Sequence, residues 1–418
     1  MTGTAASTTP EGALPELVLP AGNVSKLRFA LAYGADAVYV GAAGFSMRPD
    51  EASFTAAPLR HGVQAAHAAG KRIYVGINCL MSQGDLEPLG QWLEETRDLA
   101  MDAVIVADLG ALALVRELRP QLPVHISTQL STANTHAAAL LARLGASRVV
   151  LARECPLADA AVIARDGAVE TEVFVHGAMC VAVSGRCLLS AHLCGASGSK
   201  GACKHSCRWE WQLVEQKRPG EAVPVFETDR GTVLLGSTDL CLIEHLPAVL
   251  DSGVHALKVE GRMKSEHYVA TVARTYRAAL DTWAADPEGY RFDPAWMPAL
   301  EAVSHRPFAT GFAFGYPQDR PAALQTHNHP VSTHLVNGYI DAVDDVSHAV
   351  TVKNPFDRGD RLEWIAPGQE SGEVTVETII GPDGEPAARA HCGTSVRVRF
   401  AEAGALPPLT ILRRQKHA

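Results

Sequence analysis

Residues 72–99, RIYVGINCLMSQGDLEPLGQWLEETRDL, contain one complete strand–loop–helix unit. The β-branched and apolar run at 72–77 predicts a buried strand. Apolar residues then recur at helical spacing over 86–99, which predicts a helix with one face toward a core. The polar segment at 78–85 lies between them, at the carboxyl end of the strand. This unit is typical of a parallel α/β fold.

The same unit recurs along the first 280 or so residues, as expected for a chain built from repeated β-α units. The expected strands are Glu16–Leu19, Ala37–Val40, Arg72–Ile77, Ala103–Ala107, Val124–Thr128, Arg148–Leu151, Glu172–His176 and Ala256–Glu260. A further helical face over 268–283 follows Ser265, which is a suitable N-cap. The fold class is therefore α/β, and the rhythm favours a (β/α)8 TIM-like barrel over an open doubly wound sheet.

Uneven strand spacing divides the chain into parts. The seventh and eighth strands start 84 residues apart, at 172 and 256, whereas the others follow at intervals of 21 to 35. We therefore expect a cysteine-rich insertion at about 178–240, mounted over the carboxyl ends of the strands, where barrel enzymes build their sites. The expected parts are a disordered tail at 1–15, the barrel at 16–303, a linker at 304–330 and a small antiparallel β-barrel at 331–418.

Composition excludes several classes of protein. The chain has 418 residues, of which 47% are hydrophobic, and a net charge of −9. Such a chain can bury a core, and its acidity argues against non-specific coating of nucleic acid. No apolar run reaches the length of a membrane span, and residues 1–14 do not resemble a secretory signal. We expect a cytoplasmic protein without a membrane partner.

Six of the nine cysteines fall between 180 and 241, at positions 180, 187, 194, 203, 207 and 241. In a chain without a secretory signal, this clustering indicates a metal or cluster site rather than disulfides. The insertion contains no CxxC knuckle of the kind that zinc ribbons use. Irregular spacing favours an iron–sulfur cluster, whose corners separate loops can reach, over zinc or a set of buried structural cysteines.

Residues 172–190, EVFVHGAMCVAVSGRCLLS, resemble the signature of the collagenase-like peptidase family U-32. Further matching segments are ELVLPAGN at 16–23, YGADAVYVG at 33–41, LARE at 151–154, GACKHSCRWE at 201–210, STDLCLIEHLP at 237–247 and KVEGRMKS at 258–265. The C-terminal domain resembles the appended domain of one branch, which is similar to the tRNA 5-hydroxyuridine hydroxylases. Relatives of that branch hydroxylate ribosomal RNA or a quinone precursor, which are alternative substrates.

The resemblance implies a [4Fe–4S] cluster held by four thiolates, at Cys180, Cys187, Cys203 and Cys241, with Cys207 as the alternative to either of the last two. It also implies O₂-independent hydroxylation of the wobble uridine of tRNA with prephenate as co-substrate, and it names neither the oxygen donor nor an electron-transfer partner. A peptidase, zinc-dependent or using Cys180 with His176, is the alternative activity. However, the chain contains neither HExxH nor GxSxG.

Ionisable residues at the strand ends are the candidate catalytic groups. Arg153 and Arg262 are expected to hold a carboxylate or phosphate, because the guanidinium fork suits planar anions. Glu260 and His176 are expected to transfer protons, and Glu154 lies beside Arg153. The alternative is that these residues form salt bridges that only tie strands together. Asn78 and Gln129 are weaker candidates for reading a uracil edge.

Basic and aromatic residues of the insertion predict an RNA contact. Between 186 and 218 there are six Lys or Arg residues and two Glu residues. Cations bind phosphates and tryptophans stack on bases, so we expect this segment to bind RNA through Lys200, Lys204, Arg208 and Trp209. The C-terminal cations at 397, 399 and 413–416 form a second expected contact. A solvated charged surface is the alternative for both sets.

Overall fold

The computed structural model describes most of the two expected domains and part of the insertion. The described residues are 14–47, 52–180, 184–185, 187, 189–196, 198, 201–206, 226–228, 231–233, 238–315, 330–344, 347–401 and 404–416. Residues 1–13 of the expected tail at 1–15 therefore lie outside the described residues. In the described part of the chain, no helix is both long enough and apolar enough to cross a bilayer.

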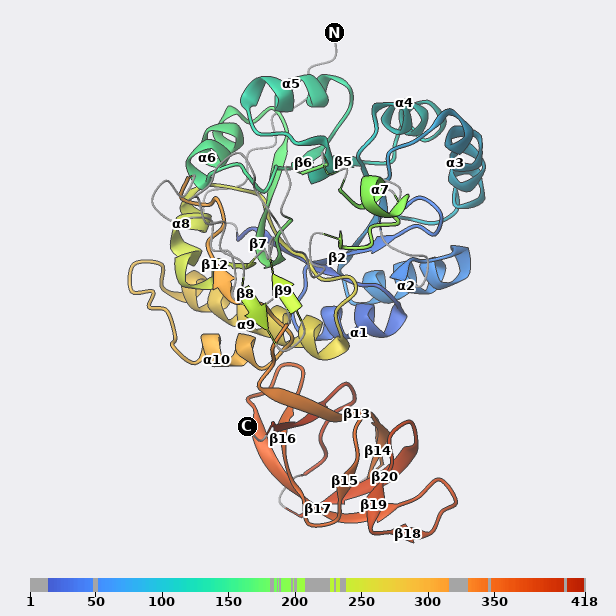
Figure 1. Cartoon of the computed structure of the whole chain (residues 1–418), viewed down its shortest axis with the longest axis vertical. Helices are drawn as coiled ribbons and strands as arrows, with labels where there is room; N and C mark the ends of the chain where they lie inside the picture. Colours follow the sequence, from blue (N-terminus) through green and yellow to red (C-terminus); the bar gives the residue numbers. More distant parts are fainter. Residues whose placement is uncertain are drawn as a thin grey trace.

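Eight parallel strands form the barrel (Figure 1), and they coincide with the eight expected runs. They are β1 (Glu16–Pro20), β2 (Ala37–Gly41), β3 (Arg72–Ile77), β4 (Ala103–Val106), β5 (Val124–Ile126), β6 (Arg148–Val150), β7 (Glu170–Ala178) and β11 (Ala256–Val259). Strand β11 pairs with both β1 and β7, so the sheet closes on itself. The barrel prediction is confirmed, and an open sheet is excluded.

Helices surround these strands on the outside (Figure 1). They are α1 (Val24–Ala32), α2 (Ala56–Ala68), α3 (Gln83–Glu95), α4 (Leu109–Leu118), α5 (Thr135–Arg143), α6 (Leu157–Asp166), α8 (Leu246–Asp251), α9 (Glu266–Ala285) and α10 (Trp296–Glu301). Helix α9 begins as predicted, because the Ser265 side chain accepts a hydrogen bond from the Tyr268 backbone N–H. Its buried face includes Tyr268 and Tyr276, which are fully covered against the barrel.

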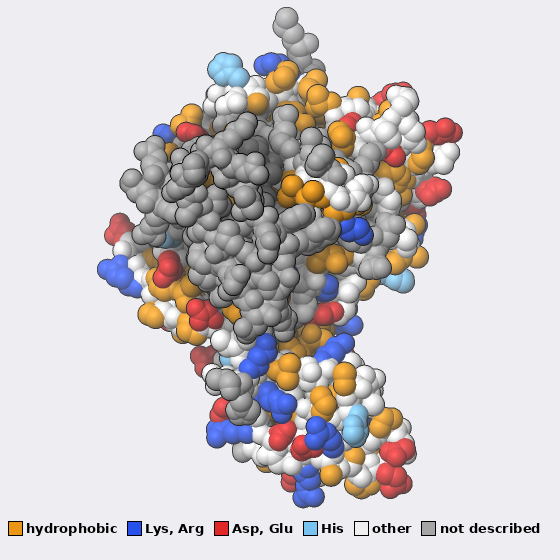
Figure 2. All heavy atoms as spheres, viewed as in Figure 1, with side chains coloured by type: hydrophobic (Ala, Val, Ile, Leu, Met, Phe, Trp, Pro, Cys, Tyr) orange, Lys and Arg blue, Asp and Glu red, His pale blue; other side chains and the backbone are white. Residues whose placement is uncertain are grey.

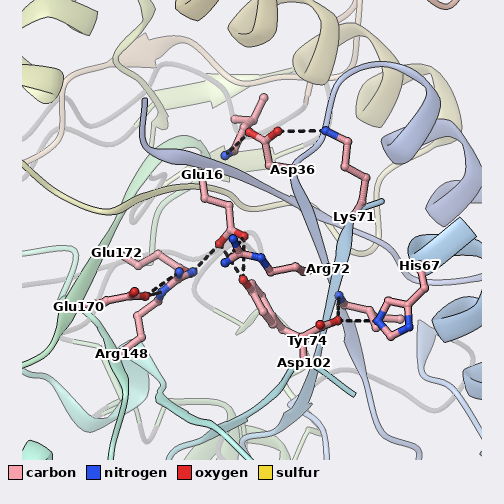
Figure 3. Close-up of polar contacts among 12 residues, drawn as sticks. Glu16, Asp36, His67, Lys71, Arg72, Tyr74, Asp102, Arg148, Glu170 and Glu172 are labelled. Atoms are coloured by element: carbon pink, nitrogen blue, oxygen red, sulfur yellow. Dashed lines mark hydrogen bonds and ion pairs between the residues drawn. The ribbon is translucent and has the colours of Figure 1, made fainter. Parts of the chain in front are cut away.

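The barrel interior contains a layer of charged side chains (Figure 3). Arg148 is central to it, with carboxylate oxygens of Glu16 at 2.6 Å, Glu170 at 2.8 Å and Glu172 at 3.2 Å. Arg72 also pairs with Glu16, at 3.2 Å, and Lys258 pairs with Glu172, at 2.6 Å. Three cations thus face three carboxylates. Arg148 and Lys258 are buried and each is paired, as buried charges require, whereas the Arg72 side chain is largely exposed.

The insertion starts where β7 extends beyond the barrel. Strand β10 (Asp239–Cys241) pairs antiparallel with the end of β7, and β12 (Phe308–Ala309) pairs parallel with β10. The insertion also contains α7 (Leu189–Cys194), β8 (Phe226–Thr228) and β9 (Gly231–Val233).

The expected linker at 304–330 is described at 304–315 and at residue 330. Its first part packs against the barrel. Arg306 is buried and pairs with Asp239 at 3.2 Å, and the Leu157 backbone N–H donates to the carbonyl of Ala313. Residues 304–315 are therefore part of the packed barrel domain rather than a free linker, because an ion pair and hydrogen bonds fix them to the barrel.

The C-terminal domain is an antiparallel β-barrel, as expected. Its principal strands are β13 (His334–Asp344), β14 (Ser347–Val352), β16 (Arg361–Ile365), β17 (Gly372–Ile380), β20 (Ser395–Phe400) and β21 (Ile411–Gln415), with short strands β15 (Phe356–Asp357), β18 (Pro386–Ala387) and β19 (Arg389–Ala390). The sheet runs β16-β21-β13-β14-β20-β17, and β16 also pairs with β17. Alternate residues of β14 and β20 are buried, which produces the alternating apolar pattern of the sequence.

The two domains share a buried contact surface. The hydroxyl of Tyr33, the C-cap residue of α1, lies 2.9 Å from the carbonyl oxygens of both Ile365 and Leu409. The rings of Phe29 and Tyr339 pack with their centroids 5.1 Å apart. Because one apolar cluster includes residues of both domains, the C-terminal barrel has a fixed place beside α1 and α9 (Figure 1).

Candidate active site

A pocket opens to solvent at the carboxyl ends of the barrel strands. It is lined from seven of the eight strands or the loops that follow them. The polar residues of its wall are Tyr39, Asn78, Ser127, Thr128, Gln129, Arg153, Lys258, Glu260 and Arg262. Lys258 is paired with Glu172 below the pocket, so the two arginines outnumber the single glutamate of the wall and make this pocket suited to an anionic ligand.

Arg153 connects the pocket to the cysteine-rich insertion. One guanidinium nitrogen, Nη1, lies 3.4 Å from the Cys180 sulfur, and the other, Nη2, lies 3.4 Å from Glu260 Oε2. The guanidinium also stacks over the ring of Phe174, 4.2 Å from its centroid. The side chain is only 6% exposed, so these contacts hold it in one orientation at the pocket wall.

Glu260 and Arg262 follow β11, which only β7 separates from the β6 strand that precedes Arg153. Glu260 accepts a hydrogen bond from the Tyr39 hydroxyl at 3.4 Å, in addition to its contact with Arg153. Arg262 is buried and donates to the Ser46 hydroxyl, and its backbone carbonyl accepts from Lys26. The structure thus brings three of the expected catalytic residues, Arg153, Glu260 and Arg262, into one pocket, together with Asn78 and Gln129.

Glu154 points toward the insertion and holds its first turn. Its Oε1 accepts a hydrogen bond from the Ser184 backbone N–H at 3.1 Å. The next residue, Gly185, has a left-handed φ of +72°, and a Cβ there would lie 1.9 Å from the carbonyl oxygen of Gln129. Only glycine allows so close an approach of two backbones. Glu154 therefore positions the segment between Cys180 and Cys187 rather than lining the pocket.

His176 lies deep in the barrel wall, outside the lining of the pocket. It is 1% exposed and packs against Tyr268, Tyr276 and Phe308. Burial, with Lys264 and His305 nearby, lowers its pKa to about 3, so the imidazole is neutral at neutral pH. Neither ring nitrogen has a hydrogen-bond partner among the described residues.

The four expected cluster ligands are described, and they occupy different environments. Cys180 and Cys187 are exposed, Cys203 is half-buried and Cys241 is buried, and all four are free thiols. A hydrogen bond of 2.9 Å from the Lys204 backbone N–H to the Ser190 hydroxyl places the segment of Cys203 beside the start of α7. Across the described residues, no three His, Cys, Asp or Glu side chains are grouped as a metal site.

Cys241 is the buried member of the expected ligand set. It is on β10 opposite His176, whereas Cys180 follows the end of β7. Burial raises the pKa of the Cys241 thiol to about 11, although hydrogen bonds from the Ile243 backbone and with Tyr276 oppose this rise. In this arrangement the thiol is protonated, whereas a cluster binds thiolate.

Most of the expected RNA contacts lie outside the described residues, namely Lys200, Arg208 and Trp209, and so does the alternative ligand Cys207. Lys204 is exposed at the end of the described cysteine segment. In the C-terminal domain, Arg413 does not serve as a surface cation as expected. It is 11% exposed and pairs with Glu363 at 3.2 Å, because β21 lies at the junction between the domains.

Lys258 is a charged pocket residue that the sequence pattern did not single out. It lies on β11 and is 5% exposed, and it extends from the charged interior layer into the pocket wall. The sequence feature that could have identified it is a lysine in the middle of a strand predicted to be buried. Lysine is rarely buried unless it is paired or functional.

Comparisons with known proteins agree with this architecture. Residues 22–322 match the family described as "Peptidase family U32", and residues 333–413 match "Peptidase family U32 C-terminal domain". The chain is 36% identical over 372 residues to "tRNA hydroxylation protein P1" of Bacillus subtilis, covering 88% of each chain. It is 34% identical to "tRNA hydroxylation protein P" of Escherichia coli, covering 89% of this chain and 90% of that protein. It is 30% identical to a "Collagenase" of Porphyromonas gingivalis, covering 72% and 73%.

Proposed function

Since this chain belongs to peptidase family U32, whose members include relatives named for tRNA hydroxylation, we propose that it is a tRNA-modifying enzyme. It hydroxylates the wobble uridine of tRNA to 5-hydroxyuridine, with a [4Fe–4S] cluster as cofactor and prephenate as co-substrate. The observation that carries this proposal is the Arg153 side chain, which contacts both Cys180 and the wall of the anion-suited pocket.

The pocket supports a reaction between a base and a small acid. Asn78 and Gln129 present amide groups that can pair with the edge of a uracil ring. Arg153 and Arg262 supply guanidinium groups for the carboxylates of prephenate. Glu260, between Arg153 and the Tyr39 hydroxyl, is the one carboxylate of the described wall and is the proposed proton-transfer group.

The cluster proposal rests on the chemistry of the thiols. Cys180, Cys187 and Cys203 are accessible and free, and Arg153 directs an N–H toward the Cys180 sulfur, as expected beside an anionic ligand. For Cys241 to bind the same cluster, its thiol must lose its proton, which burial opposes and the hydrogen bond with Tyr276 favours. A bound cluster would supply redox chemistry, while the described residues orient the substrates.

Cations on the described surface support the binding of RNA. On the face shown in Figure 2, Lys and Arg side chains gather where the C-terminal domain meets the barrel. An anticodon base is already in a single-stranded loop, so little unstacking energy is needed to bring it into a barrel mouth.

A peptidase is the second candidate, because one of the relatives is named a collagenase. A thiol peptidase would need a base beside its cysteine. Cys180 is exposed and contacts Arg153, whereas His176 is buried among aromatic rings, so the described residues do not form this pair. The geometry favours the hydroxylase over the peptidase.

Two measurements test the proposal. Nucleoside mass spectrometry of tRNA from a strain lacking the gene should show loss of 5-hydroxyuridine and its derivatives. Unchanged tRNA together with a missing modification in ribosomal RNA would instead identify the alternative substrate. Iron and sulfide analysis of anaerobically prepared protein, with Cys180→Ser as comparison, tests the cluster. A colourless wild-type protein without iron would contradict it.

A further inference from the structure

Lys258 holds a buried charge at the floor of the pocket. Its Nζ lies 2.6 Å from Glu172 Oε1 and 4.1 Å from the centroid of the Tyr39 ring. The residue is 5% exposed, and it belongs to the lining of the pocket. The ammonium is therefore directed between a carboxylate below, an aromatic face beside it and the open pocket above.

The ammonium has more donors than the protein satisfies. A lysine carries three N–H bonds, and among the described residues Glu172 is the only hydrogen-bond acceptor of Lys258. The ring of Tyr39 covers a second direction by a cation–π contact. Because unsatisfied buried donors cost free energy, the remaining direction is suited to an acceptor atom that enters the pocket.

The interior layer holds this lysine in place opposite an ionised carboxylate. Burial acts to raise the pKa of Glu172, but Lys258 and Arg148 together lower it, so Glu172 stays ionised. Arg148 is in turn held by Glu16 and Glu170, which Figure 3 shows around it. The ammonium is thus preorganised, so ligand binding does not incur the entropy cost of ordering this side chain.

We propose that the floor of the pocket is a carboxylate-binding subsite whose cation is Lys258. The inference rests on the proposed function, since the ligand would be the carboxylic acid co-substrate of that reaction. The layer below the floor is already balanced in charge, while the wall above adds two arginines and one glutamate. An anionic oxygen is therefore favoured over the neutral carbonyl of a base.

Isothermal titration calorimetry of the full chain tests the subsite, with prephenate, phenylpyruvate and uridine as separate ligands. Lys258→Met should weaken prephenate binding at least tenfold and phenylpyruvate binding in the same direction, since a lost charged hydrogen bond of about 1.5–3 kcal/mol corresponds to that change. Lys258→Arg keeps the charge and should weaken binding less. Lys71→Met, which removes a lysine paired with Asp36 outside the pocket, is the matched control and should change nothing.

Thermal unfolding shows whether each variant folds. If Lys258→Met does not fold, the test rests on Lys258→Arg, which should bind prephenate more weakly than the wild type. Equal affinities in folded wild-type and Lys258 variants would overturn the subsite. So would a loss of uridine affinity with prephenate affinity unchanged, which would place the base at the floor. A wild-type protein that modifies tRNA but binds neither acid would overturn the subsite and leave the hydroxylase activity standing.

Discussion

Arg153 Nη1 lies 3.4 Å from the sulfur of Cys180, while Nη2 of the same guanidinium lies 3.4 Å from Glu260 Oε2. One side chain thus joins the insertion to the pocket residues that follow β11. A planar group with donors on both sides can make such a bridge, whereas a lysine ammonium cannot span both partners in the same way.

Substitution of Arg153 should impair the reaction more than the fold. Arg153→Met is expected to lower kcat/KM for tRNA hydroxylation by about 10- to 100-fold, because a charged hydrogen bond contributes about 1.5–3 kcal/mol. Arg153→Lys should be intermediate. Steady-state kinetics with purified tRNA measure the effect. Arg277→Met, which removes an arginine paired with Asp36 and Asp281, is the control, and equal losses in both variants would contradict a local role.

Gly185→Ala should detach the first turn of the insertion from the barrel. A methyl group there would lie 1.9 Å from the carbonyl oxygen of Gln129, in a left-handed backbone conformation. Gly195→Ala introduces the same kind of backbone strain, at a φ of +65°, but into open space. Limited proteolysis mapped by mass spectrometry should therefore show faster cleavage of the insertion in Gly185→Ala than in Gly195→Ala. Equal cleavage rates would argue that the close contact is dispensable.

Buried neutral histidines should make stability depend on pH. Burial, aided by Arg413, lowers the pKa of His267 to about 3, and burial, aided by Arg148, lowers the pKa of His125 well below its usual value. Between about pH 6.5 and 3 the unfolded chain therefore binds more protons than the native one, so stability is full above 6.5 and falls as the pH falls. Urea unfolding at several pH values measures this slope.

His125→Phe should flatten that slope, because it removes one of the groups that must be protonated on unfolding while keeping a ring against Tyr74. The exposed His391→Phe is the comparison and should keep the wild-type slope. A slope unchanged by His125→Phe would show that other groups govern the acid side.

The hydroxyl of Tyr33 should stabilise the docking of the C-terminal domain. Tyr33→Phe removes its hydrogen bond to the carbonyls of Ile365 and Leu409, and should cost about 1 kcal/mol. Tyr290→Phe is a matched control, because the hydroxyl of Tyr290 is buried without a partner in the described part of the chain. Urea unfolding should separate the two variants, and identical midpoints would refute the assignment.

The sequence by itself determined the order of strands, both domains and the residues at the strand ends, because alternation, helical period and capping are local properties. The N-cap at Ser265 and the strand at 72–77 could be predicted from the sequence for this reason. Local patterns also put Arg153, Glu260 and Arg262 at one end of the barrel, since parallel strands share that end.

Only the tertiary structure decided which of these side chains meet. It separates Glu154 and His176 from the pocket and adds Lys258 to it. In the sequence, all three are ionisable residues in or directly after a predicted strand. The physical reason is that contacts such as Lys258 with Glu172, 86 residues apart, depend on barrel closure and on the path of β7 beyond it. Burial and pKa follow from those long-range contacts, which no local pattern contains.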